Sequence, residues 1–428
     1  MSVAEVFLRG TRIGAVQQND VASVPIFNYD PLFLNSGIEV SSLVMPLNRR
    51  TSSCPAVAEE TFHGRPGVLA DSLPDKYGTR LIEKYLSEQG RNLSSLTAVE
   101  RLLYTGKRGM GALEYVPTSD YASVEDTSIQ LSALVELASE ILSAREGVHI
   151  TDSDHVMEQI INVGTSAGGA RAKAVVAWNP ESGDIRSGQI EAGKGYTYWL
   201  IKFDGVKNNK DKGEKADGVS YTRIEYAYYL MAQEAGIDMN ECRLYQEDGY
   251  YHFMTKRFDR NDMGEKLHMQ SLGALAHYDY NMPGAYSYEQ AYDVMNRIGL
   301  GQKAAGQMFR RMVFNVLARN QDDHVKNISF LMDKSGRWFL APAYDITYAN
   351  DAGNRWVARH QMCVNGKTEN ITGEDMTACG RRMNLSKARV NRVIEEVKLA
   401  LDSWSRCAEK SFLREEDMEY IKKQFVLL

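Results

Sequence analysis

The sequence has few cysteines, and they form no pattern that binds metal or builds a disulfide framework. Five cysteines occur among 428 residues, and no two stand in a C-x-x-C pair. Disulfide scaffolds and zinc sites both need cysteines at short, regular spacings. We therefore expect neither, and we interpret each cysteine as a small apolar residue.

Long apolar runs and an excess of basic residues are also missing. No window supplies the roughly 18 apolar residues of a membrane span, and residues 1–9 lack the apolar run of a secretory signal. Asp and Glu number 56 against 50 Lys and Arg, a net charge of −6. This balance argues against a surface that binds nucleic acid as a whole, while a local basic patch stays possible. We expect a cytoplasmic protein without a membrane anchor.

The composition, with 43% apolar and 25% charged residues, is typical of packed domains. A chain of this length exceeds one compact core, so two or three units are expected. Apolar periodicity predicts strands at 6–8, 13–16, 174–178, 196–203, 243–246 and 250–256, and helices at 75–86, 131–144, 220–235, 303–319 and 386–404. The order is a mixed, strand-rich first half followed by a helical second half, as in a two-lobed kinase.

The most informative spacing lies in residues 320–346. Asp322 is followed five positions later by Asn327, and Asp345 comes eighteen residues after that. Between them, 328–332 and 337–340 are predicted strands of a hairpin. A protein-kinase-type phosphotransferase needs an Asp to orient and deprotonate the acceptor hydroxyl, an Asn five positions on to hold Mg²⁺, and a second metal-binding Asp. The spacing matches that requirement.

Two other interpretations of this cluster stay open. An Asp-Asp-His sequence after a helix is often only a cap and a solvated turn. A transition-metal site formed by Asp322, Asp323 and His324 is a further alternative, although adjacent aspartates seldom aim at one ion and no H-x-x-x-H pair is present.

Lys202 lies near the end of the predicted strand 196–203. Strand alternation places it on the face of Tyr198 and Leu200, where an ammonium is costly unless it meets an anion such as the phosphates of ATP. An exposed lysine on an edge strand is the alternative. Glu225, early in the next helix, would pair with Lys202 as in kinases, or would simply be solvated.

Small residues fill 164–173, just before the strand at 174. They let backbone N–H groups approach a triphosphate, and Arg171 and Lys173 add positive charge. The segment is neither a Walker A loop nor a clean G-x-G-x-x-G, so its signal is weak by itself. Lys256, Arg257 and Phe258, at the end of the last strand before the helical half, stand where a hinge would contact adenine.

Together these segments resemble the HipA family of bacterial serine/threonine kinase toxins. The matching motifs, in order, are Gly164–Lys173, Trp199–Lys202, Lys256–Arg260, Asp322–Phe330 and Ala341–Ile346. Phe27–Asp30, Ser42–Leu47 and Leu73–Asp75 are similar as well, so the resemblance covers most of the chain.

The resemblance implies residue roles. Asp322 would be the catalytic base, Asn327 and Asp345 the Mg²⁺ ligands, and Lys202 the phosphate-binding lysine. The rest of the ATP site would comprise Gly168, Gly169, Ala170, Arg171, Ala172, Lys173, Lys256, Arg257, Phe258, His324, Val325, Lys326 and Tyr344. Ser166 matches a loop serine that family members autophosphorylate to shut the kinase off. An extra glycine and an arginine within 168–171 depart from the family pattern and leave the loop's ATP contacts open.

The resemblance also implies a fold and partners. The fold would be α+β, kinase-like and two-lobed, with an N-terminal subdomain at 1–145, the ATP-binding part of a strand-rich N-lobe at 146–258 and an all-helical catalytic C-lobe at 259–428. A HipB-like helix-turn-helix antitoxin would bind operator DNA with this chain, and an aminoacyl-tRNA synthetase would be the target. A basic element comprising Arg381, Arg382, Lys387, Arg389 and Arg392 would touch phosphates or be a solvated helix face.

Two rival functions remain. A kinase of small-molecule hydroxyls would share the catalytic loop, but it would not need the strand-rich first 145 residues. A catalytically inactive co-repressor that supports an antitoxin on DNA would not need Lys202, Asp322, Asn327 and Asp345 together.

Overall fold

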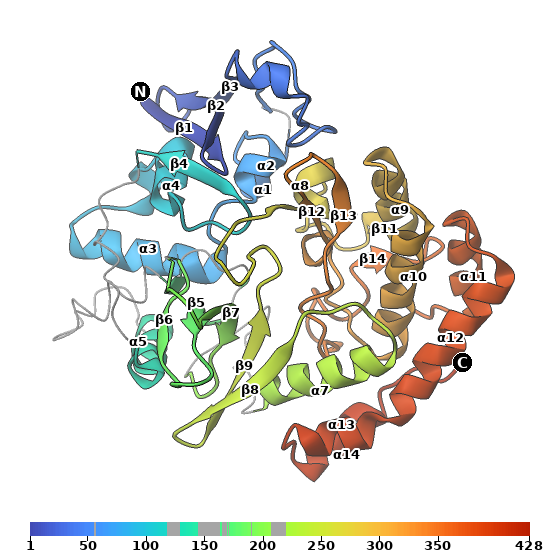
Figure 1. Ribbon diagram of the computed structural model, residues 1–428. Helices are drawn as coiled ribbons and strands as arrows, with labels where there is room; N and C mark the ends of the chain where they lie inside the picture. The colour runs from blue at the N-terminus through green and yellow to red at the C-terminus, as the bar shows by residue number, and fades with distance from the viewer. Residues whose placement is uncertain are drawn as a thin grey trace. The chain divides into compact units, whose positions relative to one another are not determined.

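The computed structural model describes residues 1–54, 57–117, 129–143, 163–164, 169, 171–189, 191–206 and 220–428. The chain forms two compact units, each assembled from separated parts of the sequence (Figure 1). Unit 1 comprises 1–219, 245–270 and 332–336, and unit 2 comprises 220–244, 271–331 and 337–428. The division at residues 145 and 258 stays a prediction.

Unit 1 begins with an antiparallel sheet whose strand order is β3-β2-β1-β4. Its strands are β1 (Ser2–Leu8), β2 (Thr11–Gln18), β3 (Ile26–Tyr29) and β4 (Leu113–Val116). Ala4, Val6 and Leu8 alternate inward along β1 and are buried, and α4 (Ala98–Thr105) packs against β1 and β2. The hairpin predicted in the first twenty residues is confirmed.

Helices lie between β3 and β4 in the sequence. Besides α4, they are η1 (Phe33–Ser36), α1 (Glu59–Phe62), α2 (Gly67–Ala70), α3 (Lys76–Glu88) and η2 (Leu93–Ser95). α4 starts at a capping box, in which Thr97 accepts from the N–H of Glu100 and the Glu100 carboxylate accepts from the N–H of Thr97. This reciprocal pair fixes the start of the helix.

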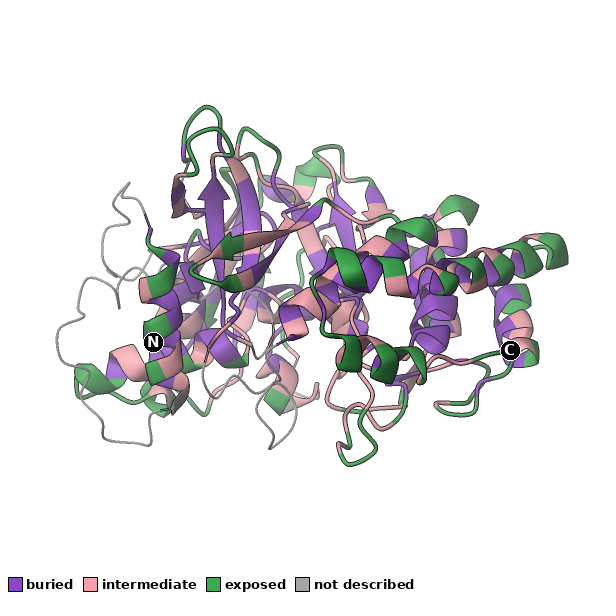
Figure 2. Cartoon of the chain, turned by 90° about the horizontal axis from the view of Figure 1, so that it is seen from below, coloured by how far each residue is buried: buried purple, intermediate pink, exposed green. Residues whose placement is uncertain are grey.

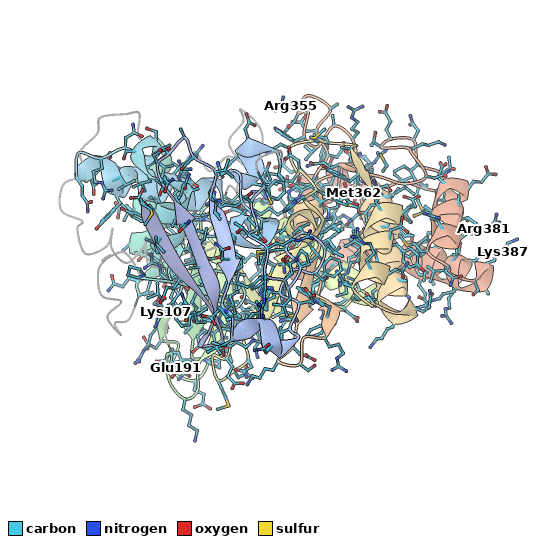
Figure 3. The ribbon with its side chains drawn as sticks, turned by 90° about the horizontal axis from the view of Figure 1, so that it is seen from above. Lys107, Glu191, Arg355, Met362, Arg381 and Lys387 are labelled. Carbon is cyan, nitrogen blue, oxygen red and sulfur yellow. The ribbon has the colours of Figure 1, made fainter. Side chains whose placement is uncertain are left out.

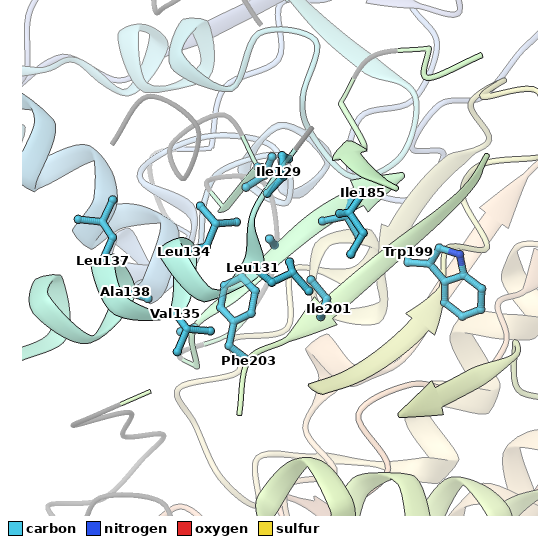
Figure 4. Packing of buried hydrophobic residues seen from close by; sticks show 14 of the residues in the cluster. Ile129, Leu131, Leu134, Val135, Leu137, Ala138, Ile185, Trp199, Ile201 and Phe203 are labelled. Atoms are coloured by element: carbon cyan, nitrogen blue, oxygen red, sulfur yellow. The ribbon is translucent and has the colours of Figure 1, made fainter. Parts of the chain in front are cut away.

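The second sheet of unit 1 has the order β6-β5-β7-β9-β8. Its strands are β5 (Lys173–Trp178), β6 (Ile185–Ser187), β7 (Thr197–Lys202), β8 (Cys242–Glu247, from Tyr245 on in this unit) and β9 (Tyr250–Lys256). One face packs on α3 and on α5 (Leu131–Ser143), and Figure 4 shows the apolar side chains gathered there. They include Ala174, Val176, Trp199, Ile201, Phe203, Leu134 and Ala138. On the opposite face of β5 and β7, Ala177 and Tyr198 join a second apolar cluster, and Lys173 pairs with Lys202.

Unit 2 is mostly helical. Its helices are α7 (Tyr221–Glu234), α8 (Leu272–Ala276), α9 (Tyr288–Arg297), α10 (Gln302–Leu317), η3 (Val325–Asn327), α11 (Gly373–Arg382), α12 (Lys387–Asp402), α13 (Trp404–Lys410) and α14 (Glu415–Lys422). The C-terminal helices bury one side and expose the other (Figure 2). α10 is buried over most of its length and carries the segment with Asp322 at its end.

Unit 2 also contains short strands, so the prediction of an all-helical C-lobe at 259–428 is wrong in this respect. β12 (Ser329–Met332) and β13 (Trp338–Leu340) are neighbours, which confirms the predicted hairpin, and β11 (Tyr286–Ser287) pairs in parallel with β14 (Met362–Cys363). β10 (His268–Ser271) spans the boundary between the units. Within the described ranges, none of the helices has the length and apolar character needed to cross a membrane.

Candidate active site

The segment with Asp322 leaves the end of α10 along a fixed path. Arg319 has a positive φ of 56°, which turns the chain out of the helix. The N–H of Gln321 donates to the carbonyl of Ala349 (3.0 Å), and the N–H of Ala349 donates to the carbonyl of Arg319 (3.1 Å). These bonds hold the loop that precedes Asp322 beside residue 349.

Asp323 anchors this loop in the interior of unit 2. Its carboxylate is buried and accepts from the Tyr288 hydroxyl (2.9 Å), from His360 Nδ1 (3.0 Å) and from the N–H of Gln361 (2.8 Å). Burial, and then the neighbouring Asp323 charge, raise the pKa of the Tyr288 hydroxyl well above its ordinary value. Tyr288 is therefore a proton donor to Asp323 at every physiological pH.

Two asparagines extend this network to the start of the loop. Asn315 Nδ2 donates to the Tyr288 hydroxyl (2.9 Å), and Asn320 Nδ2 donates to Asn315 Oδ1 (2.9 Å). All of these side chains are buried. A buried network of this kind rigidifies the segment that carries it.

The Asp322 side chain is more exposed than that of Asp323. Its side chain is 18% exposed, Oδ1 accepts from Gln361 Nε2 (2.6 Å), and His324 Nε2 lies 3.8 Å from the same oxygen. Asn327, in η3, donates its amide N–H to the backbone carbonyl of Asp322 (2.9 Å). The amide of Asn327 is thereby oriented, and its Oδ1 faces away from this carbonyl.

The segment 341–346 is fastened to the same loop. The Tyr344 hydroxyl donates to the carbonyl of Lys326 (2.7 Å) and shares a hydrogen bond with the Ser329 hydroxyl (2.5 Å). Asp345 has a positive φ of 51°. A left-handed conformation is uncommon outside glycine, although Asp adopts it more readily than most residues. Such strain clusters at functional positions.

A small cavity of about 20 Å³ brings together most of the site residues predicted in unit 2. Among its lining residues are Asp323, His324, Asn327, Tyr344 and Asp345, whereas Asp322 is not one of them. The cavity is also lined by Arg311 of α10, whose Nη2 donates to the carbonyl of Ala341 (2.7 Å). Burial lowers the pKa of Arg311 to about 10, so it stays charged at neutral pH.

Asn327 and Asp345 are a donor set that suits Mg²⁺. One carboxylate and one amide oxygen are hard ligands, and Mg²⁺ in phosphotransferases is held by few protein groups plus phosphates and water. Among the described residues, no three His, Cys, Asp or Glu side chains form a metal-binding cluster. The transition-metal alternative through Asp322, Asp323 and His324 thus gains no support. Asp323 is engaged by Tyr288, His360 and Gln361 instead.

The other predicted residues of unit 2 differ in environment. Val325 is buried, and Lys326 Nζ lies 5.3 Å from the centre of the Tyr280 ring, within cation–π range. Glu225 is buried in α7, and its pairing with Lys202 stays a prediction.

In unit 1, two predicted lysines lie opposite each other. Lys173 on β5 pairs with Lys202 on β7 in the antiparallel register, and both residues are buried, with exposed fractions of 3% and 5%. Lys202 Nζ lies 5.8 Å from the centre of the Phe253 ring on β9. The predicted alternation, with Lys202 on the face of Tyr198 and Leu200, agrees with the core cluster, which contains Trp199 and Ile201 from the other face of β7.

The glycine-rich segment is partly described. Gly169 has a φ of 102°, its N–H donates to the Asp75 carboxylate, and its carbonyl accepts from the N–H of Tyr77 (3.3 Å). Ala172 continues the sheet by accepting from the N–H of Phe203 (3.2 Å), and Arg171 is half-buried. The predicted residues Ser166, Gly168 and Ala170 lie outside the described residues.

The predicted hinge of unit 1 contains a buried ion cluster. Arg257 donates through Nε and Nη2 to Asp259 (2.8 and 2.7 Å), and Arg260 Nη1 donates to the same carboxylate (2.9 Å). Lys256 pairs with the exposed Asp262 (2.8 Å). The guanidinium of Arg257 is therefore engaged within the protein. An adenine contact by 256–258 stays a prediction.

Three side chains of the basic element on α11 and α12 make contacts within unit 2. Arg382 pairs with Asp293 (3.3 Å), Arg392 lies 3.8 Å from Glu396, and Arg389 lies against Gly306 of α10. Arg381 and Lys387 are exposed, and their side chains extend outward in Figure 3. A phosphate contact by these two residues stays a prediction.

Several residues of the site were not predicted from the sequence. Gln361 and His360 belong to no motif, and Tyr288 belongs to the apolar side of α9. Arg311 and Asn315 had a usable signal, since they are polar residues one turn apart on the buried face of α10.

Two family descriptions match most of the chain. The HipA-like C-terminal domain matches residues 165–404, more than half of the sequence, and the HipA N-terminal domain matches residues 4–116. Both fall where the sequence motifs lie.

Two individual proteins are similar to this chain. A Haemophilus influenzae protein named "Putative kinase" is 24% identical over 233 residues, which are 47% of this chain and 67% of the relative. The HipA structure from the Shewanella oneidensis MR-1 toxin–antitoxin system, solved with HipB and its operator DNA, superposes with a TM-score of 0.68. It is 17% identical, and the match covers 98% of this chain and 95% of that one. The predicted fold class is confirmed.

Proposed function

This chain belongs to the HipA family of kinase-like toxin–antitoxin proteins, and on that premise we propose that it is an ATP- and Mg²⁺-dependent protein serine/threonine kinase acting as a toxin. The observation that carries the proposal is the arrangement of the catalytic loop in unit 2. The Asp322 side chain is partly exposed, while Asn327, Tyr344 and Asp345 line one cavity.

Each residue then has a chemical task. Asp322 accepts the proton of the acceptor hydroxyl as that oxygen attacks the γ-phosphorus of ATP, and the bond from phosphorus to the bridging oxygen of ADP breaks. Asn327 and Asp345 would hold Mg²⁺, which would neutralise charge on the phosphates when bound. Lys173 and Lys202 bind phosphate oxygens. The remaining work is positioning, because the transition state of phosphoryl transfer is loose.

The partners are proposed from the relatives. The Shewanella structure contains HipB and operator DNA, which supports a helix-turn-helix antitoxin and operator DNA as partners of this chain. An aminoacyl-tRNA synthetase is the proposed substrate.

Ser166 is the proposed autophosphorylation site, since a phosphate beside the glycine-rich segment would compete with ATP for the same donors.

The direct experiment is incubation of the purified chain with γ-labelled ATP, with and without Mg²⁺. Aminoacyl-tRNA synthetases are supplied as substrates, and mass spectrometry locates the phosphate. The proposal expects Mg²⁺-dependent label on serine or threonine, at Ser166 or in a synthetase. Label only on a small-molecule hydroxyl would favour the rival phosphotransferase. Absence of Mg²⁺-dependent ATP binding would favour an inactive co-repressor.

A further inference from the structure

Gln361 contacts the catalytic carboxylate although no sequence motif contains it. Its Nε2 donates to Asp322 Oδ1 at 2.6 Å, a short bond to a charged acceptor. Only the nitrogen of an amide can donate to a carboxylate, so this contact fixes which way the Gln361 amide faces.

The backbone of Gln361 is held on both sides. Its N–H donates to Asp323 Oδ1 (2.8 Å), and its carbonyl accepts from the N–H of Gly284 (2.8 Å). Asp323 is fixed in turn by Tyr288 and His360. The buried network therefore sets where the Gln361 side chain begins.

The Gln361 side chain is only partly satisfied by hydrogen bonds in the interior. Gln361 is 3% exposed, and its Oε1 is buried without a hydrogen-bond partner. An unpaired buried acceptor destabilises the folded state. The polar contact of the Gln361 side chain is therefore the hydrogen bond that Nε2 donates to Asp322.

A hydrogen bond to the Asp322 carboxylate affects the direction in which its two oxygens point. The terminal torsion of an aspartate has a broad, weakly preferred range, so its rotamer alone does not fix the direction of the two oxygens. The hydrogen bond from Gln361 to Oδ1 restricts that rotation and gives Oδ2 a defined direction.

We propose that Gln361 is a positioning residue of the kinase, which holds the Asp322 carboxylate so that its second oxygen meets the acceptor hydroxyl. This inference rests on the proposed function. The chain of contacts runs from Asp323 through the Gln361 backbone to the Gln361 side chain and ends at Asp322.

The test replaces the amide without changing the volume. Gln361→Met keeps the length of the side chain and removes both polar atoms. Turnover should fall about 10- to 100-fold, as for a misplaced reacting group, while the KM for ATP stays unchanged and the melting temperature stays equal or rises. Gln361→Asn, too short to reach Asp322, should lower turnover similarly. Gln302→Met, at the exposed start of α10, is the matched control and should change nothing.

A double-mutant cycle separates positioning from a structural role. In Asp322→Asn there is no carboxylate to hold, so adding Gln361→Met should lower the residual rate no further. Equal effects of Gln361→Met in both backgrounds would overturn the inference, and so would wild-type turnover in Gln361→Met or a joint loss of stability and ATP binding. A wild-type chain without any phosphate transfer would instead refute the proposed function, and the inference would fall with it.

Discussion

Lys173 and Lys202 lie directly opposite each other on neighbouring antiparallel strands, and both are buried. Phosphate oxygens accept charge-assisted hydrogen bonds from ammonium groups. Two lysines held side by side on neighbouring strands can therefore both contact a ligand with several negative charges. This face of β5 and β7 is therefore the part of unit 1 on which we expect the triphosphate of ATP.

The first prediction concerns this pair. Lys202→Met keeps the apolar stem and removes the ammonium, so it should weaken Mg–ATP binding by about 10- to 100-fold, the loss expected for a charge-assisted contact. Isothermal titration calorimetry measures the dissociation constant. Lys107→Met, which alters an exposed lysine of the same unit (Figure 3), should bind ATP like the wild type. Equal affinities for all three proteins would show that the pair does not bind phosphate.

The second prediction concerns the ion cluster of Arg257, Asp259 and Arg260. Burial opposes ionisation of Asp259, but the two guanidinium groups outweigh it and hold its pKa well below the ordinary range. Asp259→Asn leaves two buried cations without their anion and should lower the free energy of unfolding by about 3–5 kcal/mol at pH 7. Urea denaturation measures this, and the exposed Asp262→Asn should change it by less than about 1 kcal/mol.

The same cluster predicts a pH dependence of stability. Because the folded-state pKa of Asp259 is depressed, its contribution is complete above the ordinary aspartate range, about pH 4. It is lost as the pH falls through the folded-state value. Below pH 4 the wild type should therefore lose stability more steeply than Asp259→Asn. Parallel curves would contradict the assignment of the shift to this group.

The next prediction concerns Arg381 and Lys387, two exposed basic residues of α11 and α12 that are not members of the ion pairs described above. If they touch operator phosphates in the complex with the antitoxin, each replacement by Ala should weaken DNA binding and lower the salt-dependence slope by about one. Fluorescence anisotropy at several salt concentrations measures both. Arg355→Ala, another exposed arginine, serves as the control. Unchanged slopes would leave these residues as a solvated helix face.

The sequence could predict the residues whose spacing is local. Asp322 and Asn327 lie on one loop, and the β12–β13 hairpin precedes Asp345, so a fixed number of residues separates them. Lys202 was found because alternation along one strand needs no knowledge of its neighbours. The register that sets Lys173 against Lys202 is a long-range pairing and could not be predicted.

Other features depend on tertiary structure in the same way. Gln361 reaches Asp322 across 39 positions, and no periodicity marks such a contact. The helix predicted over 386–404 instead stops at Asp402, and α13 starts at Trp404. Ser403 bonds the carbonyl of Ala400 through both its N–H (3.1 Å) and its hydroxyl (2.7 Å), a local competition that interrupts the helix although the apolar spacing continues.

The measurement that tests the central claim most directly is phosphate transfer by Asp322→Asn. Asparagine keeps the shape of the side chain but cannot accept the proton of the acceptor hydroxyl. We expect turnover to fall by about two to four orders of magnitude, with Mg–ATP binding retained. Incorporation of labelled phosphate at the wild-type rate would contradict the assignment of Asp322 as the catalytic base.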